Sequence, residues 1–249
     1  MSPTSVQTIA ARFGQAAETY DAAASVQARL ARTLVQKAIR GINKVPACVL
    51  DIGCGTGFVA THVAREWPWT SITAIDSAPA MLDAAQRKIP NMRVISGDAG
   101  TRDFGPSFDL ILSGMALHWL NNPCAALERW RGWLKPGGKL FTALPVAGSF
   151  AEWRQLCADY AVPDGLWVFP EGDFAARLNV KTEIETLPVD YPSAHHFLGQ
   201  IKATGAATPH PDYRPMAAGT LRRLLARAPQ PFTITYKILY MEMQSPGSI

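Results

Sequence analysis

Short apolar runs alternate with helix-like patterns along the chain from about residue 48 onwards. Segments such as "FVATHVAREW" and "PCAALERWRGWL" place apolar residues at helical spacing, whereas the runs between such segments are short and almost continuously apolar. The predicted strands, in chain order, are "CVLDIG", "SITAID", "MRVISGD", "FDLILSGM" and "GGKLFTALP". Alternation of strand and helix predicts a parallel sheet with helices on both faces, and continuous apolar runs suit strands buried on both sides.

Two later segments, 180–191 and 232–243, have a different pattern. They alternate polar and apolar residues, as in "VKTEIETLPVDY", which is typical of antiparallel strands with one wetter face. Between them lie two helix-like segments, 193–206 and 217–228, separated by a proline-rich loop around "TPHPDYRP". The predicted fold class is therefore α/β: a Rossmann-like, mostly parallel seven-stranded sheet with an antiparallel C-terminal hairpin and helices on both faces.

We expect a single domain over residues 1–249. Its predicted parts are an N-terminal helical arm (1–44), a cofactor-binding core (45–147) and two lid-like insertions (148–179 and 192–230).

The bulk composition excludes several classes of protein. Hydrophobic residues make up 48% of the chain, yet no apolar run approaches the roughly 20 residues of a membrane span, and the first thirty residues do not resemble a signal peptide. The net charge of +4 argues against a dedicated nucleic-acid binder and permits an acidic partner. The four cysteines form no C-x-x-C pair, so we expect free thiols in a cytoplasmic protein, with no metal site.

The stretch "VLDIGCGTG" places three alternating glycines directly after a predicted strand and before a predicted helix. Glycines at such a turn permit unusual backbone angles and let a nucleotide-like ligand approach the main chain. A dinucleotide fingerprint would carry a glycine where Phe58 stands, which weakens an NAD-linked interpretation. The spacing resembles the first motif of class I S-adenosylmethionine-dependent methyltransferases. That resemblance implies S-adenosylmethionine as cofactor, with its methionine part facing Asp51, Gly53, Cys54, Gly55 and Gly57.

The next two strands end in carboxylates. Asp76 can accept hydrogen bonds from vicinal ribose hydroxyls, although it or Ser77 can equally cap the following helix. Asp98 matches the position at which these methyltransferases bind the adenine amino group, with the Ala99 backbone completing the contact; the alternative is a solvated turn residue. Met81 is a candidate for the adenine face, or a core residue.

A histidine and a tryptophan follow the fourth predicted strand in "SGMALHWLNNP". The carboxyl end of this strand lies beside the first in such a sheet, so Ser113 is expected along the methionine part of the cofactor. His118 and Trp119 come where an acceptor substrate is expected, although both residue types also serve as packed structural side chains.

Several stretches resemble the malonyl-acyl-carrier-protein O-methyltransferase (BioC) family: "MALHWLNNPCAALERWRGWLKPGG", the arm "RFGQAAETYDAAASVQ", "GSFAEWR" and "IKATGA". The resemblance implies methylation of the free carboxylate of malonyl-acyl carrier protein. The resulting methyl ester primes synthesis of the pimelate part of biotin. It also implies that Tyr20 closes over the cofactor and that Tyr20, His118 and Trp119 serve catalysis.

A carboxylate acceptor is already ionised at neutral pH, so the reaction needs alignment and a dry site rather than a general base. Candidates for a lid that dries the site are Trp153, Tyr160, Trp167 and Phe169. Candidates for a cation that grips the carboxylate are Arg12, Arg29, Arg129 and Lys202. Candidates for docking an acidic carrier protein are Arg129, Arg131 and Lys135, or Arg222, Arg223 and Arg227.

Three other functions stay open at this point. The acceptor can be a small carboxylic acid or a quinone-type ring, or the chain can be a non-catalytic homologue that only binds the cofactor. We expect neither nucleic acid nor a membrane as a partner.

Overall fold

The computed structural model describes residues 6–207 and 214–246, so most of the proline-rich loop around 208–215 lies outside the described residues. One seven-stranded sheet runs through the molecule in the order β3-β2-β1-β4-β5-β7-β6. The first five of these strands are parallel, and β7 pairs antiparallel with both β5 and β6. The strands are β1 Cys48–Ile52, β2 Ser71–Asp76, β3 Arg93–Ser96, β4 Phe108–Gly114, β5 Leu134–Pro145, β6 Lys181–Tyr191 and β7 Phe232–Gln244. The predicted fold class is confirmed.

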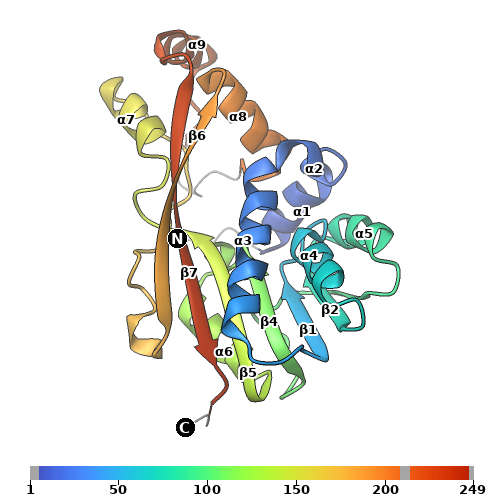
Figure 1. Cartoon of the computed structure of the whole chain (residues 1–249). Helices are drawn as coiled ribbons and strands as arrows, with labels where there is room; N and C mark the ends of the chain where they lie inside the picture. The colour runs from blue at the N-terminus through green and yellow to red at the C-terminus, as the bar shows by residue number, and fades with distance from the viewer. Residues whose placement is uncertain (1–5, 208–213, 247–249) are drawn as a thin grey trace.

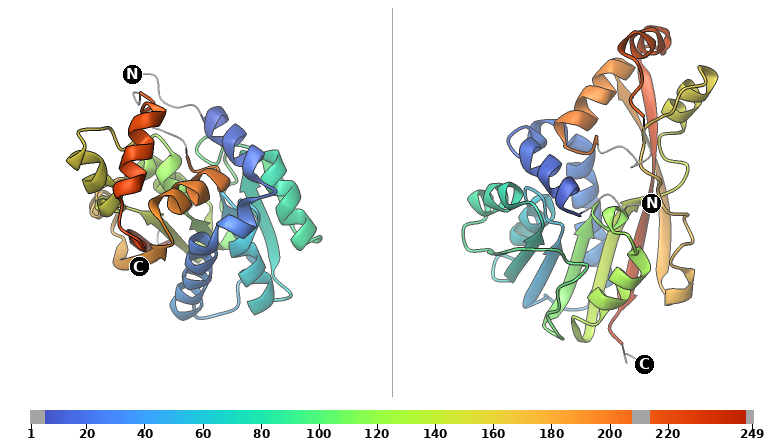
Figure 2. Two further views of the ribbon diagram at one scale, coloured as in Figure 1. Left: turned by 90° about the horizontal axis from the view of Figure 1, so that it is seen from above. Right: turned by 180° about the vertical axis from the view of Figure 1, so that it is seen from behind.

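Helices cover both faces of the sheet (Figures 1 and 2). On one face α3 (Ser25–Gly41), α4 (Phe58–Glu66) and α5 (Pro79–Lys88) pack against the parallel strands, and α6 (Pro123–Arg131) packs against the other face. The central strands are buried from both sides: the four residues Val49–Ile52 of β1 are all buried, as are Leu110–Ser113 of β4. This two-sided burial explains why these strands have continuous rather than alternating apolar sequences.

The helix predicted over 123–134 is shorter than expected. It ends at Arg131, because Gly132 closes the helix and Leu134 already pairs with Phe108 of β4. The pairing of β4 with β5 then slips between Phe108 and Leu110, where β5 carries Pro136 and two glycines. The apolar periodicity therefore continued beyond the end of the helix into the first residues of the next strand.

The predicted N-terminal arm consists of three helices, α1 (Val6–Ala16), α2 (Tyr20–Ala23) and α3. The long strands β6 and β7 extend beyond the parallel part of the sheet (Figure 1). At that end lie α7 (Ala151–Asp159), α8 (Ala194–Ala203) and α9 (Ala218–Arg227), which the sequence places in the two predicted insertions. Two short 3-10 turns, Leu117–Trp119 and Ala176–Leu178, complete the described elements.

No helix within residues 6–207 and 214–246 is long and apolar enough to cross a lipid bilayer. Within the same ranges no group of three or more His, Cys, Asp or Glu side chains is arranged to hold a metal ion. All four cysteines are free thiols.

Candidate active site

A cavity lies beyond the carboxyl ends of the parallel strands, centred where the strand order reverses between β1 and β4. This is the place at which open α/β sheets bind ligands. Its space, including the open mouth, is about 1060 Å³. The floor of the cavity is formed at the ends of four neighbouring strands. In the order β3, β2, β1 and β4, these ends contribute Asp98, Asp76, Gly53 and Gly114. The helices α1, α2 and α3 of the arm line the opposite side.

The glycine loop forms the middle of the floor. Gly53 and Gly55 have φ angles of +64° and +52°, in the left-handed region that favours glycine. A Cβ atom on Gly53 would lie 2.3 Å from the Ala116 Cβ, so the loop after β1 and the loop after β4 touch there. The N–H groups of Gly53 and Cys54 donate to the Ile75 carbonyl at 2.8 and 3.2 Å, which fixes the loop to the end of β2. The main chain from Gly53 to Gly55 is thereby held open to the cavity.

Asp76 supports this loop and also faces the cavity. Its Oδ2 accepts the Gly55 N–H at 2.9 Å, and its Oδ1 accepts the Ala78 N–H at 2.9 Å. Burial raises the pKa of the Asp76 carboxyl, and the hydrogen bonds from Ala78 and Gly55 oppose that shift. Neither Asp76 nor Ser77 caps α5, whose N-cap is Ala78. Each carboxylate oxygen keeps a lone pair for a ligand hydroxyl.

The far end of the cavity floor belongs to the turn after β3. The Asp98 Oδ1 accepts the Gly100 N–H at 2.7 Å, and the Ala99 carbonyl accepts the Trp130 indole N–H at 3.0 Å. Met81, which is 1% exposed, forms part of the adjoining wall. Together these residues form a mostly apolar part of the cavity lining that contains one carboxylate.

An acidic residue of the arm joins it to the glycine loop. The Asp21 Oδ1 accepts the Thr56 hydroxyl at 2.6 Å, and the Asp21 Oδ2 lies 2.6 Å from the Lys88 ammonium of α5. The same ammonium lies 4.8 Å from the centre of the Phe58 ring. We call Asp21, Thr56 and Lys88 the arm latch. It holds Tyr20 against Phe58, with ring centres 6.1 Å apart. Burial and then the charge of Asp76 raise the Tyr20 pKa, so the hydroxyl stays protonated near the ribose-binding candidate.

The histidine and the tryptophan after β4 have different surroundings. Trp119 lines the cavity and contacts Phe13 of the arm and Trp167 of the insertion, with ring centres 5.7 and 5.5 Å apart. His118 lies behind it, 6% exposed and outside the cavity lining, with its ring edge-on to Phe169. Burial lowers the His118 pKa to about 3, so the imidazole is neutral at pH 7. Its Nδ1 has no partner among the described residues.

Comparison with known proteins identifies the family. A sequence model described as "Methyltransferase domain" matches residues 49–138. A malonyl-acyl-carrier-protein O-methyltransferase of Magnetococcus marinus is 33% identical over 92% of this chain and 88% of the relative. The chain belongs to the malonyl-acyl-carrier-protein O-methyltransferase family. It is thus a class I methyltransferase, and its cofactor is S-adenosylmethionine.

Two further matches agree with this. A biotin biosynthesis bifunctional protein BioCD of Bordetella avium is 29% identical over 98% of this chain, which spans only 53% of that longer protein. The crystal structure of the YcgJ protein from Bacillus subtilis has the same fold, with a TM-score of 0.59 over 86% of this chain and 98% of that one at 18% identity.

Most of the residues predicted for this methyltransferase site meet in the one cavity. The predicted residues that line it are Tyr20, Gly53, Cys54, Gly55, Asp76, Ser77, Met81, Asp98, Ala99 and Trp119. Four others lie behind the lining. Asp51 accepts the Ala60 N–H at 3.1 Å, and Ser113 donates to the Ile52 carbonyl at 3.1 Å. Gly57 is the N-cap of α4, and His118 packs behind Trp119. These four are placed to support the lining rather than to touch a ligand.

Sequence reasoning missed several lining residues of the methyltransferase cavity. These are Ile9, Ala10, Gln27 and Ala31 of the arm, Phe58 and Val59 of α4, and Leu120 and Trp130 near α6. The missed signal in the arm is helical spacing: Gln27, Ala31 and Leu34 share one face of α3. A polar side chain on an otherwise apolar face was the available clue.

The four cations considered for gripping the acceptor all lie outside the cavity lining. Arg12 donates to the Ala207 carbonyl, and Arg29 is paired with Glu185 at 3.2 Å. Arg129 stands in the last turn of α6, and Lys202 in the last turn of α8. No Lys, Arg or His within residues 6–207 and 214–246 lines the cavity.

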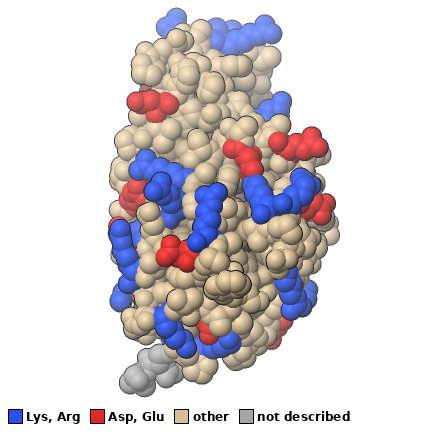
Figure 3. Space-filling model, turned by 45° about the vertical axis from the view of Figure 1, so that its right-hand side comes forward, with Lys and Arg blue, Asp and Glu red and all other residues tan. Residues whose placement is uncertain are grey.

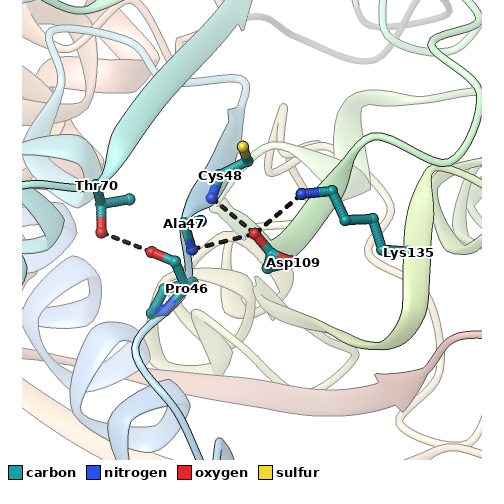
Figure 4. A network of polar contacts seen from close by, with 6 residues as sticks. All are labelled: Pro46, Ala47, Cys48, Thr70, Asp109 and Lys135. Atoms are coloured by element: carbon teal, nitrogen blue, oxygen red, sulfur yellow. Dashed lines mark hydrogen bonds and ion pairs between the residues drawn. The ribbon is translucent and has the colours of Figure 1, made fainter.

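Of the basic cluster Arg129, Arg131 and Lys135 at the end of α6, the last two are engaged at the end of the sheet opposite the cavity. Arg131 donates to the Gln244 carbonyl at 2.6 Å. The Lys135 ammonium lies 3.2 Å from the Asp109 Oδ2, which also accepts the N–H groups of Ala47 and Cys48 at the start of β1 (Figure 4). The Lys135 contact helps to hold the starts of β1, β4 and β5 together, and the Arg131 contact joins α6 to the end of β7.

The basic cluster on α9 is different. Arg222, Arg223 and Arg227 are exposed, and none forms an ion pair with any described residue. Blue and red side chains are interspersed over most of the face in Figure 3, whereas the topmost side chains, at the end where Figure 1 places α9, are blue. On the face that Figure 3 shows, this end of the molecule carries exposed positive side chains.

Proposed function

We propose that this methyltransferase transfers a methyl group from S-adenosylmethionine to the free carboxylate of malonyl-acyl carrier protein, in the biotin pathway. The observation that carries the proposal is the relative of that name, which matches nearly the full chain. The bifunctional biotin relative supports the same pathway. The cavity supports it independently, because a large, mostly apolar space suits a reaction that must exclude water. A cytoplasmic location stays a prediction.

We infer one orientation of the cofactor on the cavity floor. Asp98 and Ala99 would hold the adenine, Asp76 the ribose hydroxyls, and the backbone of Gly53 to Gly55 the methionine part. The open side of Gly55, where a Cβ would meet no atom within 4 Å, leaves room for that approach. When bound, S-adenosylmethionine supplies a methyl group activated by its positively charged sulfur. The reacting end then lies beside Gly114 and Met115, at the end of β4.

The chain's own residues orient the reactants and exclude water. The carboxylate oxygen of the acceptor forms the new O–CH3 bond as the S–CH3 bond breaks, and the electron pair stays on sulfur. No proton moves, so the neutral His118 is not needed as a base. Tyr20, Phe13 and Trp119 form an aromatic wall over the site, and His118 supports Trp119 from behind at 4.8 Å between ring centres.

The carrier protein is the proposed acidic partner, and α9 is its proposed docking surface. The three arginines of α9 face solvent and form no ion pair with any described residue, whereas Arg131 and Lys135 are held by the protein itself. Opposite charges across such a surface raise the association rate and favour the correct partner.

The decisive test is mass spectrometry of malonyl-acyl carrier protein incubated with the purified chain and S-adenosylmethionine. We expect the gain of one methyl group on the malonyl arm, and none on acetyl- or succinyl-loaded carrier. Free malonate, other small carboxylic acids and quinone-type rings serve as competing acceptors. Methylation of one of those instead would replace the proposed substrate, and cofactor binding without turnover on any acceptor would indicate a non-catalytic homologue.

A further inference from the structure

Among the residues that the structure describes, the cavity lining offers an anionic acceptor no cation, but it does offer a neutral donor. Gln27 lines the cavity from α3 and forms no hydrogen bond with any described residue. Its side-chain amide therefore keeps both N–H groups free. The other polar side chains of the lining are largely assigned: Asp76 and Asp98 accept backbone N–H groups, and the Trp130 indole donates to Ala99.

The helix geometry places Gln27 at the reacting end of the cavity. The Leu34 side chain lies beside the end of β4, since a Cβ on Gly114 would come within 3.7 Å of the Leu34 Cδ2. Gln27 stands seven residues earlier on the same face of α3, about 10 Å further along the helix axis and beyond the strand end. Tyr20, by contrast, packs against Phe58, next to the glycine loop that Asp76 holds, and so lies toward the ribose end.

Resting on the proposed function, we propose that the Gln27 side-chain amide binds the acceptor carboxylate and that this subsite works without a fixed cation. The charge balance of the reaction explains why the acceptor subsite needs no fixed cation. The carboxylate is negative and the sulfur of the methyl donor is positive before the transfer, and both are neutral after it. A buried arginine would gain nothing from the neutral ester and would be left as an uncompensated charge. A neutral amide orients the oxygen, leaves its charge available for attack and releases the ester.

Steady-state kinetics with malonyl-acyl carrier protein, paired with calorimetry of S-adenosylmethionine binding, tests the assignment. Gln27→Leu should raise KM for the carrier about ten- to a hundredfold, the loss typical of a hydrogen bond to a charged group, with cofactor Kd within twofold. Gln27→Glu should raise KM further, because it places a negative charge beside the acceptor carboxylate. This variant is close in size to wild type and replaces Gln27→Leu as the test if the leucine variant folds poorly. Gln27→Lys should lower both KM and kcat. Gln36→Leu, an exposed position on the same helix, is the matched control and should change nothing.

Three results would overturn the assignment. One is an unchanged KM in both Gln27→Leu and Gln27→Glu. Another is a cofactor Kd that rises in place of KM, which would make Gln27 a cofactor contact. The third is a Gln27→Lys variant with kcat equal to or above that of wild type, which would show that a fixed cation at this subsite does not slow the transfer. A wild-type chain that binds the cofactor but leaves malonyl carrier unmethylated would overturn the proposed function itself, a result distinguishable from all three.

Discussion

The arm latch makes a quantitative prediction about cofactor affinity. Asp21→Ala removes a hydrogen bond to Thr56 and an ion pair with Lys88. The part-buried hydrogen bond contributes about 1 kcal/mol. The side chains of the ion pair are 45% and 30% exposed, so solvent screening limits it to about 0.5 kcal/mol. The closed arm therefore loses about 1.5 kcal/mol relative to the open arm, which predicts a rise of roughly tenfold in cofactor Kd.

Calorimetry of S-adenosylmethionine binding measures this effect directly, and stopped-flow kinetics should assign most of it to faster dissociation. Thr56→Val and Lys88→Met should each reproduce part of it, and the double variants with Asp21→Ala should show less than the sum of the single effects. Glu18→Ala is the matched control, because Glu18 is an exposed acid of the same arm with no ion pair to any described residue.

A cofactor Kd within twofold of wild type for Asp21→Ala would refute the reasoning, because it would show that the closed arm does not depend on the latch. Fully additive effects of Asp21→Ala and Lys88→Met would refute the ion-pair part alone. A fall in thermal stability without ligand as large as the loss of affinity would mean that the contacts stabilise the whole fold rather than the closed arm.

Three further predictions concern buried polar groups. Asp76→Asn should weaken S-adenosylmethionine binding about tenfold or more by calorimetry, since charge-assisted bonds to ribose hydroxyls are lost; an unchanged Kd would contradict the ribose assignment. Burial raises the Asp51 pKa to about 7, so the folded chain holds a proton that the unfolded chain has released, and stability falls as pH rises from about 4 to 7. In urea unfolding at pH 5 and pH 8, the stability of Asp51→Asn should lack this dependence on pH. A difference in unfolding free energy between the variant and wild type that is the same at both pH values would contradict the prediction. His118→Ala should lower kcat more than cofactor affinity by loosening Trp119, and His118→Phe should restore most of kcat unless the imidazole N–H itself is needed.

The sheet was predictable because its strands have unambiguous patterns. The buried run "CVLDI" and the alternating "VKTEIETLPVDY" each fit one kind of strand, and the observed β1 and β6 agree with those predictions to within a residue or two. The end of α6 was not predictable from periodicity, because Trp133 and Leu134 continue its apolar spacing while belonging to the next turn and strand. Backbone pairing with Phe108 decided that boundary, and pairing partners are not visible in a single sequence.

The floor of the site was predictable for a related reason. Residues at the ends of consecutive parallel strands must meet at one edge, so the sequence alone is enough to group Gly53, Asp76 and Asp98. Which residues line the cavity and which lie buried behind the lining was not predictable. His118 and Trp119 are adjacent in sequence, yet one is sealed behind the other by Phe169 from a distant segment. The arm posed the same difficulty, since only the path of the chain shows which face of α3 meets the cavity.

The arm is attached on two sides, and this links the two halves of the reaction. On the cofactor side it is held by the latch, and on the other side the Thr19 hydroxyl donates to the Ala203 carbonyl at the end of α8. Gly205 approaches the arm so closely that a Cβ there would lie 2.8 Å from the Arg12 carbonyl oxygen. An opening of the arm wide enough to exchange the cofactor must therefore also break its contacts with α8. Because Phe13 of α1 and Tyr20 of α2 line the cavity opposite its floor, the acceptor subsite is enclosed only when this part of the arm has closed over the cofactor. We therefore expect the cofactor to bind first and the carrier second, an order that product-inhibition patterns with S-adenosylhomocysteine would reveal.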